Sequence, residues 1–498
     1  MVLFFAAPNR LIYAVETSDN PDNPDIKKLL WLFGEAEFHN DKRLEGFFIG
    51  PRKEMITPWS TNAVEITQNM GISGISRIEE FFRAGSDKTK YDPMLQAFYE
   101  GLDQNIFRID KEPDPIIYLD NIRAFNAQEG LALSDDEIIY LEDLSKRLGR
   151  KLTDSEVFGF SQINSEHCRH KIFNGTFIID GKEMTDSLFS MIKKTSKINP
   201  NRIVSAYKDN VAFIAGPNIE QFAPATQDKP DFFKVVDIDT VISLKAETHN
   251  FPTTVEPFNG AATGTGGEIR DRMAGGKASL PMAGTAVYMT SYPRTEKNRS
   301  WEQFSKPRKW LYQTPEEILI KASNGASDFG NKFGQPLICG SVLTFEHFTE
   351  LKKYGYDKVI MLAGGIGFGK KQDSRKDNPK PGDKIIVMGG DNYRIGMGGG
   401  AVSSVATGEY GNMIELNAVQ RSNPEMQKRV ANAIRALAEM EKNPIISIHD
   451  HGAGGHLNCL SELIEESGGK IDINKLPVGD PTLSAKEIVG NESQERMG

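Results

Sequence analysis

The stretch LKAETHNFPTTVEPFNGAATGTGGEIRD at 244–271 is the most informative part of this chain. A strand is predicted over 235–247. Its apolar face is expected to be buried and carries Ile238, Ile242, Leu244 and Ala246. Because side chains alternate between the faces of a strand, Lys245 and Glu247 share the other face, and His249 joins them if the strand continues. This combination suits a nucleotide and metal site, although an edge strand with a solvated polar face fits the same spacing.

Four glycines follow this strand and are expected to form an anion-binding loop: Gly260, Gly264, Gly266 and Gly267. Without a Cβ atom, such residues let backbone N–H groups approach a phosphate. Arg270 offers a bidentate fork for phosphate, and Asp271 can join Glu247 as an oxygen ligand for Mg²⁺. A glycine loop alone is often only a turn, but a loop, a cation and two carboxylates so close together favour a nucleotide site.

Two other glycine motifs fail the tests for nucleotide binding. GGIGFGK at 364–370 lacks the Ser or Thr of a P-loop, since Lys371 follows it. GMGGGA at 396–401 begins eight residues after the strand predicted at 384–388 ends, so the tight strand–turn–helix context of a Rossmann site is missing. Both readings are therefore set aside.

Two histidine-containing segments are candidate site elements. In SEHCRHK at 165–171, His167 and His170 are one helical turn apart and share a face if the preceding helix continues, the alternative being a polar helix end. The strand predicted at 444–450 ends at Asp450 before a glycine turn. This position suits a third Mg²⁺ carboxylate, the alternative being a capped turn with surface histidines.

Local signals predict three helices. Ser134 and Glu137 form a capping box for a helix that Gly149 ends. A second helix starts at Thr153 or at the next residue. A third covers about 424–441 and begins with a proline, which is favoured in the first turn.

The composition excludes several classes of protein. A length of 498 residues favours three or four domains. The net charge of −9 argues against a nucleic-acid binder, whose domains are normally basic. The three cysteines form no CxxC pair, which favours a reducing, cytoplasmic location. No apolar run approaches the ~18 residues that a membrane span needs.

With these residues in place, the chain resembles phosphoribosylformylglycinamidine synthase (FGAR amidotransferase) in its large, multidomain form. One departure is Phe251, where the family motif has His. The motifs run in one order along the chain: GPRKEMITPWSTNA (50–63), SEHCRHKIFN (165–174), KAETHNFPTTVEPFNGAATGTGGEIRD (245–271), ASNGASDFGNKFGQP (322–336), RIGMGGGAVSS (394–404), AVQRSNPEMQKRV (418–430), HDHGAGGH (449–456) and NESQERMG (491–498).

The resemblance implies a multidomain α+β architecture. A PurS-like domain is expected at 1–130, a helical linker domain at 131–200, and one AIR-synthetase-like half with an N-subdomain at 201–380 and an incomplete C-subdomain at 381–498. The family continues with a second such half and a glutaminase domain. The chain is therefore expected to be an N-terminal portion that does not hydrolyse glutamine, and to self-associate through the apolar surface meant for the second half.

The implied reaction converts formylglycinamide ribonucleotide (FGAR) to formylglycinamidine ribonucleotide (FGAM) with Mg²⁺, ATP and glutamine-derived ammonia. The implied catalytic residues are His167 and His249, the second as proton acceptor. The implied ATP contacts are Lys245, Gly260, Gly264, Thr265, Gly266, Gly267 and His170. The implied substrate contacts are Thr248, His249, Asn250, Arg270, Gln420, Glu492, Ser493 and Gln494. The implied Mg²⁺ ligands are Glu247, Asp271 and Asp450.

Two other hypotheses remain. The chain by itself is a non-catalytic scaffold that needs the second half, or it belongs to another ATPase of the AIR synthetase superfamily, such as selenophosphate synthetase. Those enzymes lack the PurS-like start and the SEHCRH segment, which disfavours the last reading.

Overall fold

The computed structural model describes residues 1–19, 22–34, 36–85, 89–296, 299–304, 306, 313–492 and 495–498. The chain divides into two compact units. The first consists of Met1–Pro115 with Asp391–Arg394 and Pro477–Ser484, and the second of Ile116–Gly390, Ile395–Leu476 and Ala485–Gly498. Within the described residues, every helix is too short or too polar to span a lipid bilayer.

The first unit is built on an antiparallel six-stranded sheet in the order β3-β1-β2-β5-β4-β6. Two helices pack on one face through Leu29 and Ala63, and each begins at a side-chain cap, Asp22 and Thr57 respectively. The elements are β1 (Val2–Ala6), β2 (Leu11–Thr17), α1 (Asn23–Leu32), β3 (Glu37–His39), β4 (Leu44–Pro51), α2 (Pro58–Asn69), β5 (Ile75–Arg83) and β6 (Gln96–Leu102).

The second unit opens with helices whose ends follow the predicted signals. Ser134 and Glu137 form the capping box of α4, and Gly149 ends this helix at a φ of 65°. Thr153 caps α5. These predictions are confirmed. The elements are α3 (Ile122–Glu129), α4 (Asp135–Leu148), α5 (Asp154–Ile163), η1 (Glu166–Cys168), α6 (His170–Asn174), β7 (Ile178–Ile179), β8 (Lys182–Glu183) and α7 (Leu188–Ile198).

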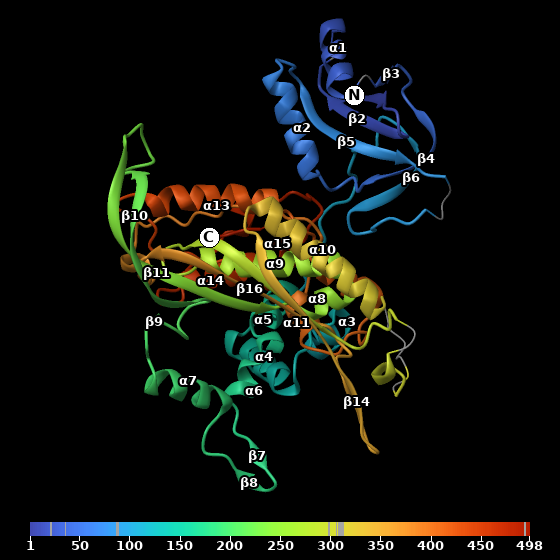
Figure 1. Cartoon of the computed structure of the whole chain (residues 1–498). Helices are drawn as coiled ribbons and strands as arrows, with labels where there is room; N and C mark the ends of the chain where they lie inside the picture. The colour runs from blue at the N-terminus through green and yellow to red at the C-terminus, as the bar shows by residue number, and fades with distance from the viewer. Residues whose placement is uncertain are drawn as a thin grey trace. The chain divides into compact units, whose positions relative to one another are not determined.

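A second six-stranded sheet, in the order β13-β12-β16-β11-β10-β9, forms the centre of this unit (Figure 1). Only β12 and β13 are parallel. Helices α9 and α10 pack on one face of the sheet and against each other. The elements are β9 (Ile203–Ser205), β10 (Ala212–Pro224), β11 (Phe233–Thr248), α8 (Asn250–Val255), α9 (Pro257–Met273), β12 (Leu280–Thr290), η2 (Ser300–Glu302), α10 (Pro315–Phe333), β13 (Leu337–Thr344), β14 (Glu346–Phe348), β15 (Lys353–Gly355), β16 (Ile360–Lys370) and η3 (Lys371–Asp373).

The burial of β11 is the reverse of the prediction. Val241 and Ser243 are buried under the helices. The residues expected inside are partly or fully exposed: Ile238, Ile242, Leu244 and Ala246. The prediction was wrong because this chain places helices on only one face of the sheet, and that face carries Lys245 and Glu247.

The last part of the unit is mainly helical. The helix predicted at 424–441 is confirmed as α13, with a proline in its first turn. The strands predicted at 384–388 and 444–450 are not formed, since these segments make only isolated bridges from Met388 and Asp450 to Met497. The elements are α11 (Gly399–Ser403), α12 (Asn412–Ala418), α13 (Pro424–Glu439), α14 (Gly455–Leu463), η4 (Ile473–Lys475) and α15 (Ala485–Gly490).

Candidate active site

The end of β11 and the C-terminal half of α9 bring three charged side chains together. Lys245 and Glu247 project from one face of β11, as predicted, and Asp271 comes from α9. The Nζ atom of Lys245 lies 3.0 Å from Oε2 of Glu247 and 2.8 Å from Oδ2 of Asp271. The structure therefore gathers a cation and two of the carboxylates that the sequence singled out.

These contacts shift the pKa values of the partners. Burial lowers the pKa of the Lys245 ammonium, but the Asp271 and Glu247 carboxylates outweigh it, so the net shift is upward. Burial raises the pKa of Glu247 to about 7, with Asp271 adding to this effect and Lys245 opposing it. The two carboxylates repel each other, and positive charge between them is stabilising.

Arg270 lies next to this cluster and already has protein partners. Its Nη1 atom donates to Oε1 of Gln427 at 3.0 Å and forms an ion pair with Glu495. Its Nε atom is 3.8 Å from Oδ2 of Asp450. Burial and the Asp271 charge raise the pKa of Asp450 well above its ordinary value. The Glu495 partner was not found from the sequence, because no local pattern links residues so far apart in the chain.

The side chains gathered here fit the needs of a hard cation such as Mg²⁺ only in part. The side chains of Glu247 and Asp271 supply carboxylate oxygens, and the Lys245 ammonium pairs with both. Asp450 instead faces Arg270. Among the residues that the structure describes, no group of three or more His, Cys, Asp or Glu side chains is arranged to hold a metal ion. The three predicted Mg²⁺ ligands thus lie in one region without forming a coordination shell.

His249 is held as a neutral imidazole at the end of β11. Its Nδ1 atom is 2.5 Å from the carbonyl oxygen of Gly260. Because a carbonyl only accepts hydrogen bonds, Nδ1 carries the proton and Nε2 keeps a free lone pair. Burial lowers the pKa of His249 to about 4; the Gly260 carbonyl opposes this shift, and the charges of Arg270 and His167 add to it. His249 is thus able to accept a proton at Nε2.

The helix before His167 does not continue to His170, so the condition for a shared helix face is not met. Helix α5 ends at Ile163, and Arg169 adopts a left-handed φ of 57° between η1 and α6. His167 is exposed, yet crowding by neighbouring protein atoms lowers its pKa, and the charge of His170 lowers it further. His167 acts electrostatically on His249, which places both imidazoles in the same region.

The predicted anion-binding loop is a helix, which is a second correction. The glycines Gly260, Gly264, Gly266 and Gly267 lie within α9 (Pro257–Met273), where backbone N–H groups bond within the helix. A Cβ atom on Gly260 would lie 2.4 Å from the Pro252 backbone, and one on Gly264 would lie 2.8 Å from Cβ of His249. Gly260 and Gly264 therefore allow close packing instead of cradling a phosphate.

Other predicted contacts are placed as follows. The Asn250 side chain accepts a hydrogen bond from the Met361 N–H at 3.0 Å, and Thr248 is exposed. The Thr265 hydroxyl is buried without a hydrogen-bond partner in the described part of the chain. Ser493 and Gln494 lie outside the described residues.

The side chain of Glu492 lies against the glycine-rich segment at 396–401, which was considered above as a Rossmann motif. Its Oε1 atom accepts from the Gly400 N–H at 3.3 Å, and a Cβ atom on Gly399 would lie 2.6 Å from Oε2. Gln420 donates to the Glu492 carbonyl. The turn thus surrounds a carboxylate of the protein itself, and burial raises the pKa of Glu492 to about 7.

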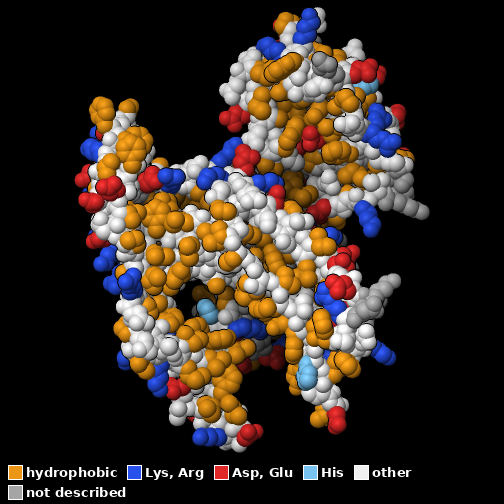
Figure 2. Space-filling view, viewed as in Figure 1, with side chains coloured by type: hydrophobic (Ala, Val, Ile, Leu, Met, Phe, Trp, Pro, Cys, Tyr) orange, Lys and Arg blue, Asp and Glu red, His pale blue; other side chains and the backbone are white. Residues whose placement is uncertain are grey.

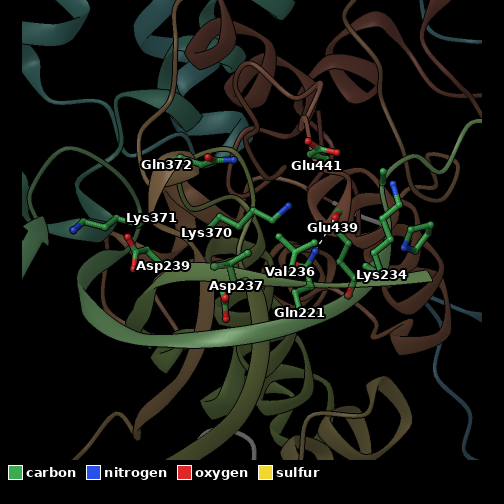
Figure 3. A pocket seen from close by; sticks show the side chains of 14 residues that line it. Gln221, Lys234, Val236, Asp237, Asp239, Lys370, Lys371, Gln372, Glu439 and Glu441 are labelled. Atoms are coloured by element: carbon green, nitrogen blue, oxygen red, sulfur yellow. Dashed lines mark hydrogen bonds between the residues drawn. The ribbon is translucent and has the colours of Figure 1, made fainter. Parts of the chain in front are cut away.

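A cavity of about 560 Å³ lies away from these residues, where β10 and β11 approach the end of α13 (Figure 3). Lys234, Lys370, Asp237 and Glu439 are among its lining residues. Lys370 donates to the Met440 carbonyl at 2.6 Å. None of the predicted site residues lines this cavity, so its volume gives no support to the predicted chemistry.

Comparison with known families identifies the class of protein. Residues 380–497 match the C-terminal domain of AIR synthase-related proteins. Residues 122–171 match the linker domain of formylglycinamide ribonucleotide amidotransferase, and residues 10–100 match its N-terminal domain. The chain is thus AIR synthase-related, with an α+β multidomain architecture as predicted. It belongs to the formylglycinamide ribonucleotide amidotransferase family.

Solved structures that match part of this chain include PurL of T. maritima complexed with FGAR, at 25% identity over 72% of this chain and a TM-score of 0.47. The same protein complexed with ATP matches at 24% identity over 72% of this chain, with a TM-score of 0.44. The alignments cover 47% and 46% of those chains, so this chain spans about half the length of these relatives.

Proposed function

We propose that this chain carries much of the site at which FGAR is converted to FGAM in cytoplasmic purine biosynthesis, with ATP and ammonia as co-substrates. The main support is the Lys245, Glu247, Asp271 and His249 arrangement at the end of β11, in a chain of this family. Under this proposal, ammonia comes from a glutaminase domain outside this chain.

The proposed chemistry has two steps. The substrate amide oxygen takes the γ-phosphoryl group of ATP, which converts the oxygen into a leaving group. Ammonia then attacks the amide carbon, phosphate leaves, and the nitrogen loses a proton. His249 is the proposed proton acceptor because its Nε2 atom is unprotonated. Its pKa of about 4 keeps the imidazole neutral at pH 7, although it also makes the ring a weaker base than an ordinary histidine. His167 is the second proposed catalytic residue.

Charge neutralisation is the proposed role of the acidic cluster. Glu247, Asp271 and Asp450 would hold Mg²⁺, which neutralises phosphate charge during phosphoryl transfer. Lys245 would contact a phosphate. The raised pKa values of Glu247 and Asp450 support this assignment, because each carboxylate gains from added positive charge.

The strength of the structural support differs among the remaining proposed site residues. Arg270 would bind substrate only by exchanging or sharing its Glu495 partner. The ATP role proposed for the α9 glycines and Thr265 cannot use a loop of free N–H groups, since these residues are helical. Substrate contacts are proposed for the other members of the predicted set: Thr248, Asn250, Gln420, Glu492, Ser493 and Gln494. His170 is proposed to contact the nucleotide.

An uncovered apolar sheet face supports the proposal of a second synthetase half. Its residues are cross-strand neighbours in four pairs: Ile242 with Phe368, Leu244 with Ile366, Val287 with Leu362 and Met289 with Leu343. Figure 2 shows hydrophobic side chains gathered over these strands. A patch of this kind normally marks a protein interface. We call it the apolar face.

The test is ADP release from FGAR, Mg²⁺-ATP and ammonium, with and without the remaining portion of a family member supplied as a separate chain. We expect FGAR-dependent release only with the added chain, and a loss of at least ~100-fold in His249→Ala, the size typical of general acid–base catalysis. Ser190→Ala, a hydroxyl deletion on α7, should keep full activity.

A non-catalytic scaffold is the second candidate, favoured by the exposed apolar face. Absence of FGAR-dependent ADP release in both conditions, with binding of the added chain retained, would establish this reading and overturn the catalytic proposal.

A further inference from the structure

Ser165 connects the end of α5 to the proposed catalytic histidine. Its Oγ atom is 2.9 Å from the carbonyl oxygen of Gln162 and 2.5 Å from Nδ1 of His167. The Gln162 carbonyl belongs to the last turn of α5, where no following N–H of the helix is available to it. It therefore needs a donor from outside the helix, and the Ser165 hydroxyl is that donor.

A count of hydrogens then fixes the state of the imidazole. A serine hydroxyl has one hydrogen and two lone pairs. Because the hydrogen is used by the Gln162 carbonyl, Ser165 must accept at its contact with His167. The Nδ1 atom of His167 is consequently the donor, and Nε2 of the neutral ring has no proton.

The packing around Ser165 restrains this geometry. A Cβ atom on Gly400 would lie 2.9 Å from the Ser165 Oγ atom and 3.1 Å from the Gln162 carbonyl oxygen. The Ala401 N–H approaches the side-chain oxygen of Gln162 at 3.4 Å. Gln162 is fully buried. The start of α11 therefore packs closely against Ser165 and limits movement of its hydroxyl.

We propose that Ser165 is a positioning residue that holds His167 in the tautomer with the proton on Nδ1 and the lone pair on Nε2. His249 has the same tautomer through a different acceptor, the Gly260 carbonyl. Both imidazoles then have an unprotonated Nε2 atom. The tautomer follows from the structure alone, whereas its value for turnover rests on the proposed function.

The tautomer is measured by NMR of the whole chain labelled with ¹⁵N-histidine, and the His167 signals are identified by their loss in His167→Gln. We expect the Nδ1-protonated form in the natural chain and in Ser165→Thr, which keeps the hydroxyl. Ser165→Ala should lose the Nδ1-protonated signal in favour of the Nε2-protonated form. Ser190→Ala, the remote hydroxyl deletion, should leave the His167 signals unchanged.

Turnover with the second half supplied gives the other readout. In Ser165→Ala we expect kcat to fall by ~10-fold or more, as for other wrong-tautomer histidines, with KM little changed. An Nε2-protonated His167 in the natural chain, or an unchanged tautomer in Ser165→Ala, overturns the proposal. An altered tautomer with unaltered turnover keeps the tautomer assignment and refutes only its catalytic role. If Ser165→Ala fails to fold, Gly400→Ala, which displaces the same hydroxyl, must shift the tautomer instead.

Discussion

Carboxylates at this site are stabilised by different partners, and the nature of the partner decides what each can do. Glu247 and Asp271 share the Lys245 ammonium, whereas Glu495 pairs with Arg270. The Glu492 carboxylate instead accepts hydrogen bonds from uncharged donors such as the Gly400 N–H, and these only partly offset the cost of burying it. Of these carboxylates, Glu492 therefore offers the simplest relation between pH and stability.

Glu492→Gln is expected to change how stability depends on pH. The folded-state pKa of Glu492 is raised from 4.5 to about 7, so its stabilising effect is complete below pH 4.5 and is lost as pH rises through 7. This pKa shift corresponds to a decrease of up to ~3 kcal/mol in the free energy of unfolding of the natural chain between pH 4.5 and pH 8. Thermal unfolding at pH 5 and pH 8 should show a larger decrease in Tm for the natural chain than for the variant. Equal decreases would contradict the raised pKa.

At the scale of elements, helix α9 is unusual because it combines several glycines with almost complete burial. Glycine lowers intrinsic helix stability by ~1 kcal/mol relative to alanine. The helix forms nevertheless, because the missing side chains let it approach α8, β11 and α10 closely. Gly325 of α10 follows the same rule, since a Cβ atom there would lie 2.0 Å from the Phe258 carbonyl oxygen.

Two glycine substitutions in α9 should have opposite effects. Gly264→Ala places a methyl group 2.8 Å from Cβ of His249, so we expect a loss of ~1–3 kcal/mol in stability and displacement of the imidazole. Gly267→Ala meets nothing closer than 3.8 Å, so we expect a gain of up to ~1 kcal/mol from helix propensity. Thermal unfolding of both variants is the measurement. A Gly264→Ala variant as stable as the natural chain would show that close packing is not the reason for glycine at this position.

At the scale of the whole molecule, the second sheet has helices on one face only. Ile366 is 43% exposed and Leu343 is 48% exposed, although both are strand residues of a central sheet. Exposed apolar area of this kind favours association, since its burial contributes about 25 cal/mol per Å². The expected occupant is the second synthetase half, and in its absence another copy of this chain.

Sedimentation velocity over a range of concentrations tests this expectation. The chain should self-associate as its concentration rises, and the double variant Ile366→Lys with Leu343→Lys should remain monomeric. The matched control is Leu351→Lys, because Leu351 is 97% exposed but lies off the apolar face. A natural chain that remains monomeric at every concentration would contradict self-association through this face.

The sequence alone determined the features that depend on neighbours within a few residues. The capping box of Ser134 and Glu137 follows from i to i+3 geometry, and the shared face of Lys245 and Glu247 from i to i+2 geometry. The proline start of α13 follows from the fixed φ and the missing N–H of that residue. Family motifs likewise identified the architecture, because they are stretches of sequence.

Only the tertiary structure decided the rest. Whether glycines 260–267 form a loop or a helix depends on what packs against them, and local propensity favoured the wrong answer. The buried face of β11 depends on where α9 and α10 lie. The Glu495 partner of Arg270 and the break between η1 and α6 at Arg169 likewise depend on contacts or backbone conformations that no local spacing records. Burial and long-range pairing are properties of the folded chain, and they decide which charged groups remain available for chemistry.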